Sequence, residues 1–206
     1  MRIGIDFDNT IAGYDHVFAA AAREIGFVPP GFSGGKRDVR EALRRRPDGE
    51  REWMALQGQV YGARMDEAVF VEGADEFLAR CRRKGVEAFI VSHKTVHGHF
   101  DSNQVDLRAA AWRWMEDRGF FAGDAFPFSA DRVFFEDTRS AKIARLAAIG
   151  CTHFIDDLPE VFLEPSFPAG VRRYLLVTGD GPPPTGPFRA FRRWHDISHD
   201  ILGEDD

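Results

Sequence analysis

Short apolar segments with the length of β-strands alternate with helical segments through most of this chain. The helical stretches contain apolar residues at helical spacing, and several of them end at a glycine. This alternation predicts an α/β fold with a mainly parallel, five-stranded sheet and helices on both faces. Residues 188–202 are expected to form an amphipathic closing segment. The expected strands are residues 2–5, 86–91, 132–135, 152–155 and 173–177, and the main expected helices are residues 14–26, 74–84, 103–118 and 138–149.

A long helical stretch separates the first strand from the rest of the sheet. Residues 14–70 contain no strand pattern of their own and are too long for a simple connection in a compact domain. We therefore expect this stretch to be an inserted helical module. The expected α/β core then consists of residues 1–13 and 71–206.

Composition excludes several classes of function. The 206 residues are 44% hydrophobic and 29% charged, which is typical of a soluble globular protein. The net charge of −6 argues against nucleic-acid binding, and no apolar run approaches the roughly 20 residues of a membrane span. The two cysteines, Cys81 and Cys151, do not form a CxxC pair. A cytoplasmic protein with reduced thiols is the expectation.

Polar side chains directly follow the carboxyl ends of three of the predicted strands. Asp6 and Asp8 follow the first strand, Ser92 follows the second, and Asp156 and Asp157 follow the fourth. In an open α/β sheet, ligands bind beyond the carboxyl ends of the strands. Carboxylates gathered there repel each other and resist desolvation, so a bound cation would stabilise them. Because all the ligands are oxygen atoms, the expected cation is a hard ion, and Mg²⁺ fits best.

The same segments resemble the four motifs of the haloacid dehalogenase-like (HAD) superfamily of phosphohydrolases. They are Ile3–Thr10, Phe89–Ser92, Lys142 and Phe154–Asp157, in the order that the family shows. The resemblance implies a Rossmann-like core with a small helical cap inserted between the first two motifs. It also implies Mg²⁺-dependent hydrolysis of a small phosphorylated metabolite, either a sugar phosphate or a nucleotide.

The resemblance assigns roles to the acidic residues. Asp6 would be the nucleophile that forms an aspartyl-phosphate, and Asp8 would be the general acid for the leaving oxygen and then the base for water. Asp6, the backbone carbonyl of Asp8 and Asp156 would bind Mg²⁺. Asp157 would hold a metal-bound water or support the direct ligands.

Other residues are expected to bind the phosphoryl group. Ser92 would donate a hydrogen bond to it, and Lys142 would neutralise charge on Asp6 and on the transferring group. Lys94, two residues after Ser92, is a second candidate for the neutralising lysine; Lys142 is favoured because it opens the helix before the Asp156 strand. The remaining expected phosphate-binding residues are Asn9, Thr10 and His93. Asn9 stands where glycine is frequent, and asparagine tolerates a left-handed backbone, so a turn at this position is possible.

Three alternatives to a phosphohydrolase share this set of residues. A dehalogenase does not need an acid at the position of Asp8, because a halide leaves without a proton, so Asp8 favours phosphoester chemistry. A phosphotransferase or mutase of the same family would pass the phosphoryl group to a second substrate instead of water. A non-catalytic binding domain would keep the fold without turnover, and the presence of every motif residue argues against it.

Overall fold

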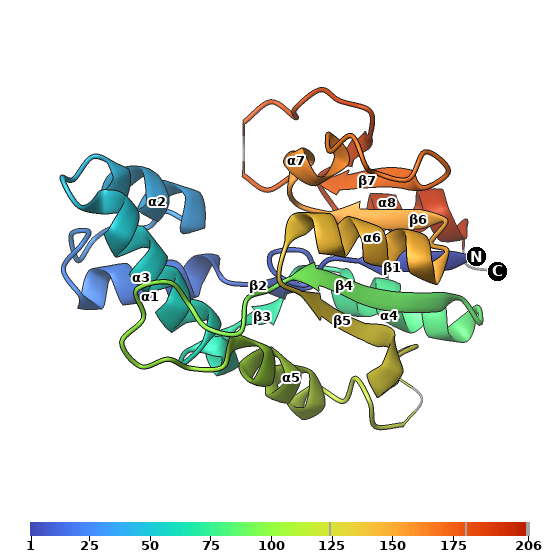
Figure 1. Ribbon diagram of the computed structural model, residues 1–206, viewed down its shortest axis with the longest axis horizontal. Helices are drawn as coiled ribbons and strands as arrows, with labels where there is room; N and C mark the ends of the chain where they lie inside the picture. Colours follow the sequence, from blue (N-terminus) through green and yellow to red (C-terminus); the bar gives the residue numbers. More distant parts are fainter. Residues whose placement is uncertain (124, 180, 205–206) are drawn as a thin grey trace. The chain divides into compact units, whose positions relative to one another are not determined.

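The computed structural model describes residues 1–123, 125–179 and 181–204. The chain forms two compact units, which we call the core unit and the helical unit (Figure 1). The core unit consists of Met1–Ala12, Phe70–Lys94 and Glu116–Asp206, and the helical unit consists of Gly13–Val69 and Thr95–Met115.

The core unit is built on a six-stranded sheet with the strand order β5-β4-β1-β6-β7-β8. Every neighbouring pair of strands in this sheet is parallel, which confirms the predicted parallel α/β fold. The sheet has one strand more than the five expected, because β8 forms within the segment expected to close the fold. The strands are β1 (Arg2–Ile5), β4 (Glu87–His93), β5 (Val133–Glu136), β6 (His153–Asp156), β7 (Arg172–Leu176) and β8 (Arg189–Phe191).

Helices cover both faces of this sheet. Figure 1 shows α6 (Arg139–Ile149) in front of the strands, and α4 (Ala74–Arg83) and α8 (Trp194–Leu202) behind them. Behind the sheet, the rings of Phe77 and Trp194 lie 4.8 Å apart and join α4 to α8. The core unit also contains the short helices η2 (Ala130–Arg132) and α7 (Pro159–Phe162).

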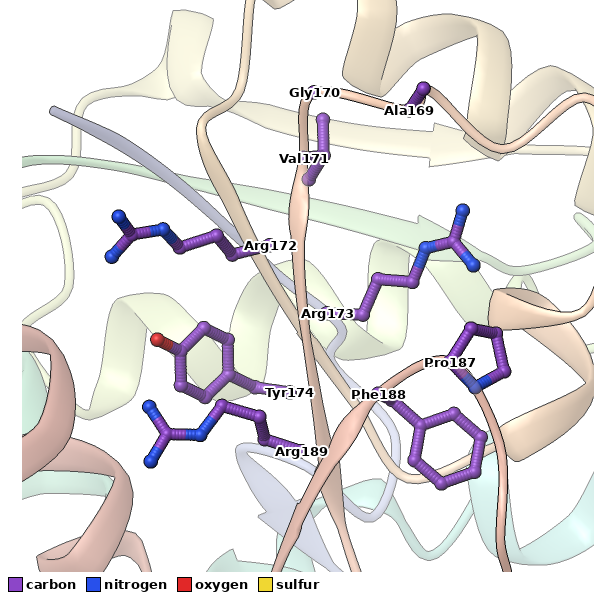
Figure 2. Close-up of a pocket in the computed structure, with 9 residues that line it drawn as sticks. All are labelled: Ala169, Gly170, Val171, Arg172, Arg173, Tyr174, Pro187, Phe188 and Arg189. Atoms are coloured by element: carbon purple, nitrogen blue, oxygen red, sulfur yellow. The ribbon is translucent and has the colours of Figure 1, made fainter.

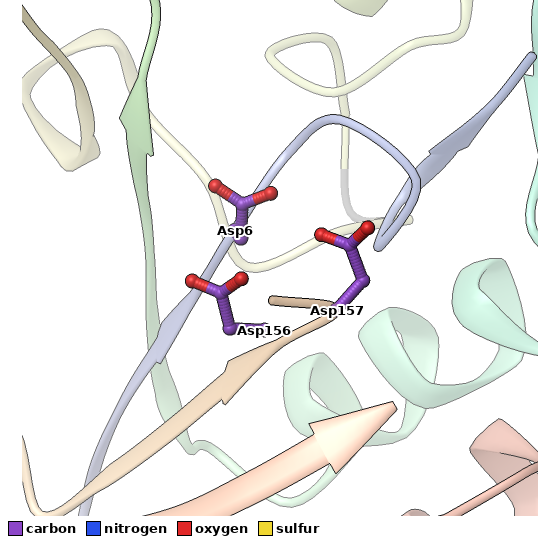
Figure 3. A group of neighbouring side chains, drawn as sticks. All are labelled: Asp6, Asp156 and Asp157. Atoms are coloured by element: carbon purple, nitrogen blue, oxygen red, sulfur yellow. The ribbon is translucent and has the colours of Figure 1, made fainter. Parts of the chain in front are cut away.

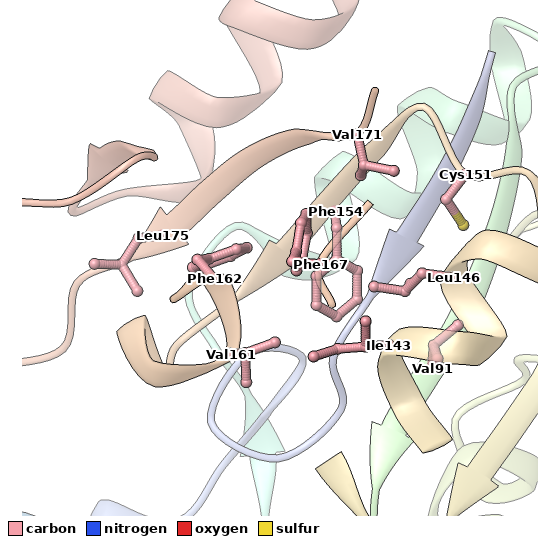
Figure 4. Packing of buried hydrophobic residues seen from close by; sticks show 10 residues of the cluster. All are labelled: Val91, Ile143, Leu146, Cys151, Phe154, Val161, Phe162, Phe167, Val171 and Leu175. Atoms are coloured by element: carbon pink, nitrogen blue, oxygen red, sulfur yellow. The ribbon is translucent and has the colours of Figure 1, made fainter. Parts of the chain in front are cut away.

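An apolar cluster fills the space between the sheet and α6 (Figure 4). The helix contributes Ile143 and Leu146, and the strands contribute Val91, Phe154 and Leu175. Burial of such side chains contributes about 1.5–3 kcal/mol each, so this cluster fixes the position of α6 on the sheet. Its remaining members are Cys151, Val161, Phe162, Phe167 and Val171.

Gly4 allows α6 to approach the middle strand closely. A Cβ atom at Gly4 would lie 2.9 Å from both Leu146 Cδ2 and Phe154 Cδ2, and 3.2 Å from Cys151 Sγ. Real Cβ atoms essentially never make contacts below 3.0 Å, so a side chain at Gly4 would force Leu146 and Phe154 to shift from their packed positions between α6 and the sheet.

We therefore expect Gly4→Ala to destabilise the protein by about 1–3 kcal/mol, the usual cost of overpacking a core. Unfolding in urea would measure the change. Gly170→Ala is the matched control, because a Cβ there meets nothing within 4 Å. The control should stay within about 0.5 kcal/mol of the native protein. Equal stability of the two variants would contradict the close approach of α6.

The helical unit has its own aromatic core. The rings of Phe18 and Trp53 stack at 5.0 Å, and Tyr14 and Tyr61 meet edge to face at 4.9 Å. The chain passes from the core unit into this unit within β2 (Ala12–Gly13) and returns within β3 (Val69–Phe70), and β2 and β3 pair as a two-stranded sheet. The helices are α1 (Asp15–Glu24), α2 (Lys36–Arg44), α3 (Gly49–Tyr61), η1 (Met65–Glu67) and most of α5 (Leu107–Asp117).

The helical unit includes a segment that the sequence analysis assigned to the core. Residues 95–115, which contain most of α5, pack with residues 13–69. The indole N–H of Trp114, which is buried, donates a hydrogen bond to the carbonyl of Ala68 at 2.9 Å. A helical pattern predicts the helix itself but does not indicate which unit its apolar face will contact.

Across the described residues, no helix combines the length and the apolar character that crossing a bilayer requires.

Candidate active site

The three strands that carry the predicted site residues lie side by side. β4 and β6 flank β1, and the parallel register aligns Ile5 with both Ile90 and Ile155. After β1, the chain adds β4 and then β5 on one side of that strand, and it then adds β6, β7 and β8 on the other side. The strand order therefore reverses at β1, which makes this strand the topological switch point of the sheet. Ligands bind at such points in α/β sheets. Asp6, directly after β1, and Asp156, the last residue of β6, therefore emerge at the same edge.

The loop after β1 makes a tight turn. The backbone N–H of Ala12 donates to the carbonyl of Phe7 at 2.9 Å, and the N–H of Asn9 donates to the carbonyl of Ala12 at 2.7 Å. Asn9 has a φ of 60°, so it adopts the left-handed conformation that asparagine tolerates. The turn directs the chain back across the end of β1 and keeps Asp6 and Asp8 at the sheet edge.

Three carboxylates gather at this edge. Ligand oxygens of Asp6, Asp156 and Asp157 all lie within 4.8 Å of one another (Figure 3). Asp6 is 5% exposed and Asp156 is fully buried, so these charges cannot be screened by bulk water. Such a cluster needs positive charge nearby to remain ionised.

Lys142 supplies one positive charge. Its Nζ lies 2.6 Å from Asp6 Oδ1 and 2.6 Å from Asp156 Oδ2, and the whole side chain is buried on α6. Thr138 caps the helix by accepting a hydrogen bond from the N–H of Ala141, so Lys142 lies in the first turn with its position fixed. The predicted pairing of Lys142 with the Asp6 carboxylate is therefore present in the structure.

Burial and the neighbouring opposite charges shift the pKa values of Lys142 and Asp156 in opposite directions. Burial lowers the pKa of Lys142, but the charges of Asp156 and Asp6 outweigh it, so the pKa is raised and the ammonium form is kept. Burial raises the pKa of Asp156 to about 6, although the charge of Lys142 opposes that rise. Asp156 Oδ1 also accepts a hydrogen bond from the N–H of Leu158 at 2.9 Å. The lysine and this N–H together hold Asp156 in one orientation.

Lys94 contacts a different carboxylate. Its Nζ lies 3.0 Å from Asp8 Oδ1 and 2.9 Å from Asp8 Oδ2. The two candidate lysines therefore divide between the two aspartates of the first motif: Lys142 contacts Asp6, and Lys94 contacts Asp8. The sequence analysis paired Lys142 with Asp6 and placed Lys94 near the site, but it did not assign Asp8 as the partner of Lys94.

Two predicted site residues carry buried hydroxyl groups. Ser92 Oγ and Thr10 Oγ1 have no hydrogen-bond partner within the described part of the chain. Leaving a buried hydroxyl without a partner costs free energy, so these groups are available to an incoming ligand with acceptor oxygens. Both residues were expected to bind phosphate, and a phosphoryl group has such oxygens.

One predicted residue has a backbone partner, and one contributor was missed. The exposed His93 donates from Nε2 to the backbone carbonyl of Asp137 at 3.0 Å, and its pKa is lowered, mainly by partial desolvation of the ring. The missed residue is Trp194 on α8, whose indole N–H donates to the carbonyl of Thr10 at 2.9 Å. Its partner lies 184 residues away, so no local sequence signal could have indicated the contact.

A cavity of about 720 Å³ lies at the other end of the sheet, at the amino ends of β7 and β8 (Figure 2). Its three arginines do not converge: Arg172 and Arg189 extend to one side of β7 and Arg173 to the other. Arg189 pairs with Asp200, and Arg173 donates to the carbonyl of Phe162. The cavity therefore does not form a second charged site. The other lining residues are Ala169, Gly170, Val171, Tyr174, Pro187 and Phe188.

No protein-family model matches the sequence, and no curated protein matches it significantly. Among solved structures, a HAD-superfamily hydrolase from Ehrlichia chaffeensis is similar with a TM-score of 0.55 at 14% identity, over 97% of this chain and 95% of that chain. The chain has the haloacid dehalogenase-like fold.

Two further structures share this HAD-like fold. A HAD family hydrolase from Deinococcus radiodurans, with bound phosphate and sodium, matches 90% of this chain and 84% of its own, with a TM-score of 0.51 and 16% identity. The HAD-hydrolase YfnB from Bacillus subtilis, bound to magnesium, matches 98% of both chains, with a TM-score of 0.53 and 12% identity. The fold implied by the sequence resemblance is thus confirmed, and its motif residues Asp6, Lys142 and Asp156 are in contact.

Proposed function

We propose that this protein is a cytoplasmic, Mg²⁺-dependent phosphohydrolase that cleaves a small phosphomonoester through an aspartyl-phosphate on Asp6. The observation that carries the proposal is the contact of Lys142 Nζ with Asp6 Oδ1 at 2.6 Å, beside two more carboxylates. A carboxylate that attacks a phosphate must overcome repulsion between two anions. A buried ammonium group beside the nucleophile reduces that repulsion.

The carboxylate cluster fits a divalent cation. Asp6, Asp156 and Asp157 with Lys142 carry a formal charge of −2, three carboxylates against one ammonium, and every donor in the cluster is an oxygen. Mg²⁺ suits a site with few carboxylates and a phosphate ligand. Asp6, Asp156 and the backbone carbonyl of Asp8 would hold the ion, and Asp157 would support them. When bound, Mg²⁺ would neutralise charge on the phosphoryl group.

In the first half of the reaction, the phosphoryl group moves to the protein. An oxygen of Asp6 attacks phosphorus and forms a new O–P bond while the bond to the leaving oxygen breaks. Asp8 gives its proton to that leaving oxygen, which departs as an alcohol. Ser92 and Thr10 donate hydrogen bonds to the phosphoryl oxygens through hydroxyls that have no other partner in the described chain.

In the second half, water restores the enzyme. The ionised Asp8 takes a proton from water as its oxygen attacks phosphorus, and the bond between phosphorus and Asp6 breaks. Inorganic phosphate and the free Asp6 carboxylate result. Lys142 remains beside Asp6 through both halves and balances its charge.

Asp8 also favours cleavage of a phosphoester over displacement of a halide. A halide needs no proton, whereas an alkoxide is a poor leaving group unless it is protonated. Phosphotransfer to a second substrate would use the same residues and differs only in the acceptor. We further propose that residues 14–70 serve as a cap that selects small substrates, such as sugar phosphates or nucleotides, and restricts water.

The test is phosphate release from a panel of sugar phosphates and nucleoside monophosphates, with Mg²⁺ and with a chelator. We expect release from at least one compound, and its loss with chelator. Chloroacetate and related haloacids belong in the same panel. Halide release without phosphate release would overturn the proposal in favour of a dehalogenase. Phosphate that moves to an added sugar without appearing in solution would indicate a phosphotransferase.

A further inference from the structure

The core unit contains a second buried lysine that the reaction described above does not use. Lys94 is 3% exposed, close to the 2% of Lys142, and an ammonium group buried this deeply needs an ionic partner. The partner is Asp8, whose two carboxylate oxygens lie 3.0 and 2.9 Å from Lys94 Nζ. The Asp8 side chain is 16% exposed, so the pair is largely shielded from water.

The backbone after β4 fixes the place of Lys94. Side chains alternate at the end of the strand, so Ser92 and Lys94 are buried while His93 between them is exposed. The N–H of Lys94 donates to the carbonyl of Glu136 at 2.9 Å, which extends the pairing of β4 with β5 by one residue. The Lys94 ammonium also lies 5.7 Å from the ring centre of Phe7. Lys94 is therefore held at a defined distance from the loop that carries Asp8.

We propose that Lys94 is the positioning residue for Asp8. An aspartate that exchanges a proton with a leaving oxygen must hold one orientation, and contact of one ammonium with both carboxylate oxygens restricts rotation of that group. When Asp8 carries the proton that it donates, one oxygen holds that proton and the other accepts from Lys94; once the proton has moved to the leaving oxygen, both carboxylate oxygens accept from Lys94 again. Lys94 acts through Asp8 and Lys142 acts on Asp6, so each aspartate has its own lysine. This inference rests on the proposed phosphohydrolase function.

A change in the leaving group separates this role from phosphate binding. The parameter kcat/KM reports the steps up to transfer of the phosphoryl group to Asp6, where Asp8 protonates the leaving oxygen. An alkyl phosphate needs that proton, whereas 4-nitrophenyl phosphate has a leaving group that departs without it. A defect confined to Asp8 should therefore affect the first substrate and spare the second.

The test compares Lys94→Met with the native protein on both substrates. General acid catalysis contributes typically 10²–10⁴-fold, so we expect Lys94→Met to lower kcat/KM about 100-fold for the alkyl phosphate and less than about threefold for the aryl phosphate. Asp8→Asn should show the same pattern. In the double variant, Lys94→Met should add no loss to that of Asp8→Asn, because residues that act through one another are not additive.

Lys84→Met is the matched control. Lys84 is exposed and its Nζ donates to the carbonyl of Glu204 at 3.2 Å, so the control should keep native kinetics on both substrates. If Lys94→Met does not fold, as judged by thermal unfolding, Lys94→Gln keeps an N–H donor without the charge. Lys94→Gln should give the same dependence on leaving group.

Two results would overturn the inference and can be told apart. An equal loss on both substrates, together with weaker inhibition by inorganic phosphate, would make Lys94 a phosphate ligand and leave the proposed function intact. Native protein that releases phosphate from no substrate would remove the proposed function, and the role of Lys94 with it.

Discussion

Asp6→Asn is expected to abolish phosphate release while leaving the fold unchanged. Asparagine has the size of aspartate, but its amide oxygen is a poor nucleophile and it carries no charge for a metal ion. Removing the nucleophile of an enzyme with a covalent intermediate costs about 10⁵–10⁶-fold in kcat, and we expect a loss of that order. Lys142 would keep its contact with Asp156, so the buried ammonium would retain one partner.

Three measurements check this prediction. Steady-state release of phosphate gives the loss in kcat, and thermal unfolding shows whether Asp6→Asn is folded. Acid quenching with radiolabelled substrate should retain label on the native protein and none on Asp6→Asn. Asp117→Asn is the control, because Asp117 is an exposed residue at the end of α5 and should behave as native. Activity of Asp6→Asn within about tenfold of native would place the nucleophile elsewhere.

The arrangement of the acidic residues could be anticipated because it depends on strand direction. Once the segments that precede Asp6 and Asp156 are identified as parallel strands of one sheet, their carboxyl ends must meet at the same edge. The left-handed turn at Asn9 could also be expected, since the chain has to reverse after the first strand and asparagine tolerates a positive φ. Both inferences use only local sequence and the geometry of a parallel sheet.

The features that escaped prediction depend on contacts between distant segments. β8 covers only three residues, Arg189–Phe191, and its alternation is too short to be distinguished from a loop; it becomes a strand because the edge of β7 is available for pairing. The partner of Lys94 depends on the side-chain direction at the end of β4. Placement of residues 95–115 in the helical unit depends on which neighbours their apolar side chains contact.

Lys142→Met is expected to affect both stability and catalysis. The substitution keeps a long side chain but removes the charge that Asp6 and Asp156 contact at 2.6 Å, deep in the core unit. Breaking a buried ion pair on one side costs about 3–5 kcal/mol, because the remaining charge is left without compensation. The same loss removes positive charge from the proposed site of phosphoryl transfer, and we expect kcat to fall about 10²–10³-fold.

Added Mg²⁺ distinguishes the electrostatic explanation from a packing defect. In chelator, the melting temperature of Lys142→Met should fall well below that of the native protein, by about 2–4 °C for each kcal/mol lost in a chain of this size. A cation that binds the folded carboxylate cluster stabilises it by mass action, so Mg²⁺ should raise the melting temperature of Lys142→Met more than that of the native protein. Lys84→Met, which changes an exposed lysine, should match the native protein under both conditions. A deficit in Lys142→Met that Mg²⁺ does not reduce would mean that Lys142 supports the fold by packing, and that uncompensated charge on Asp6 and Asp156 is not what destabilises the variant.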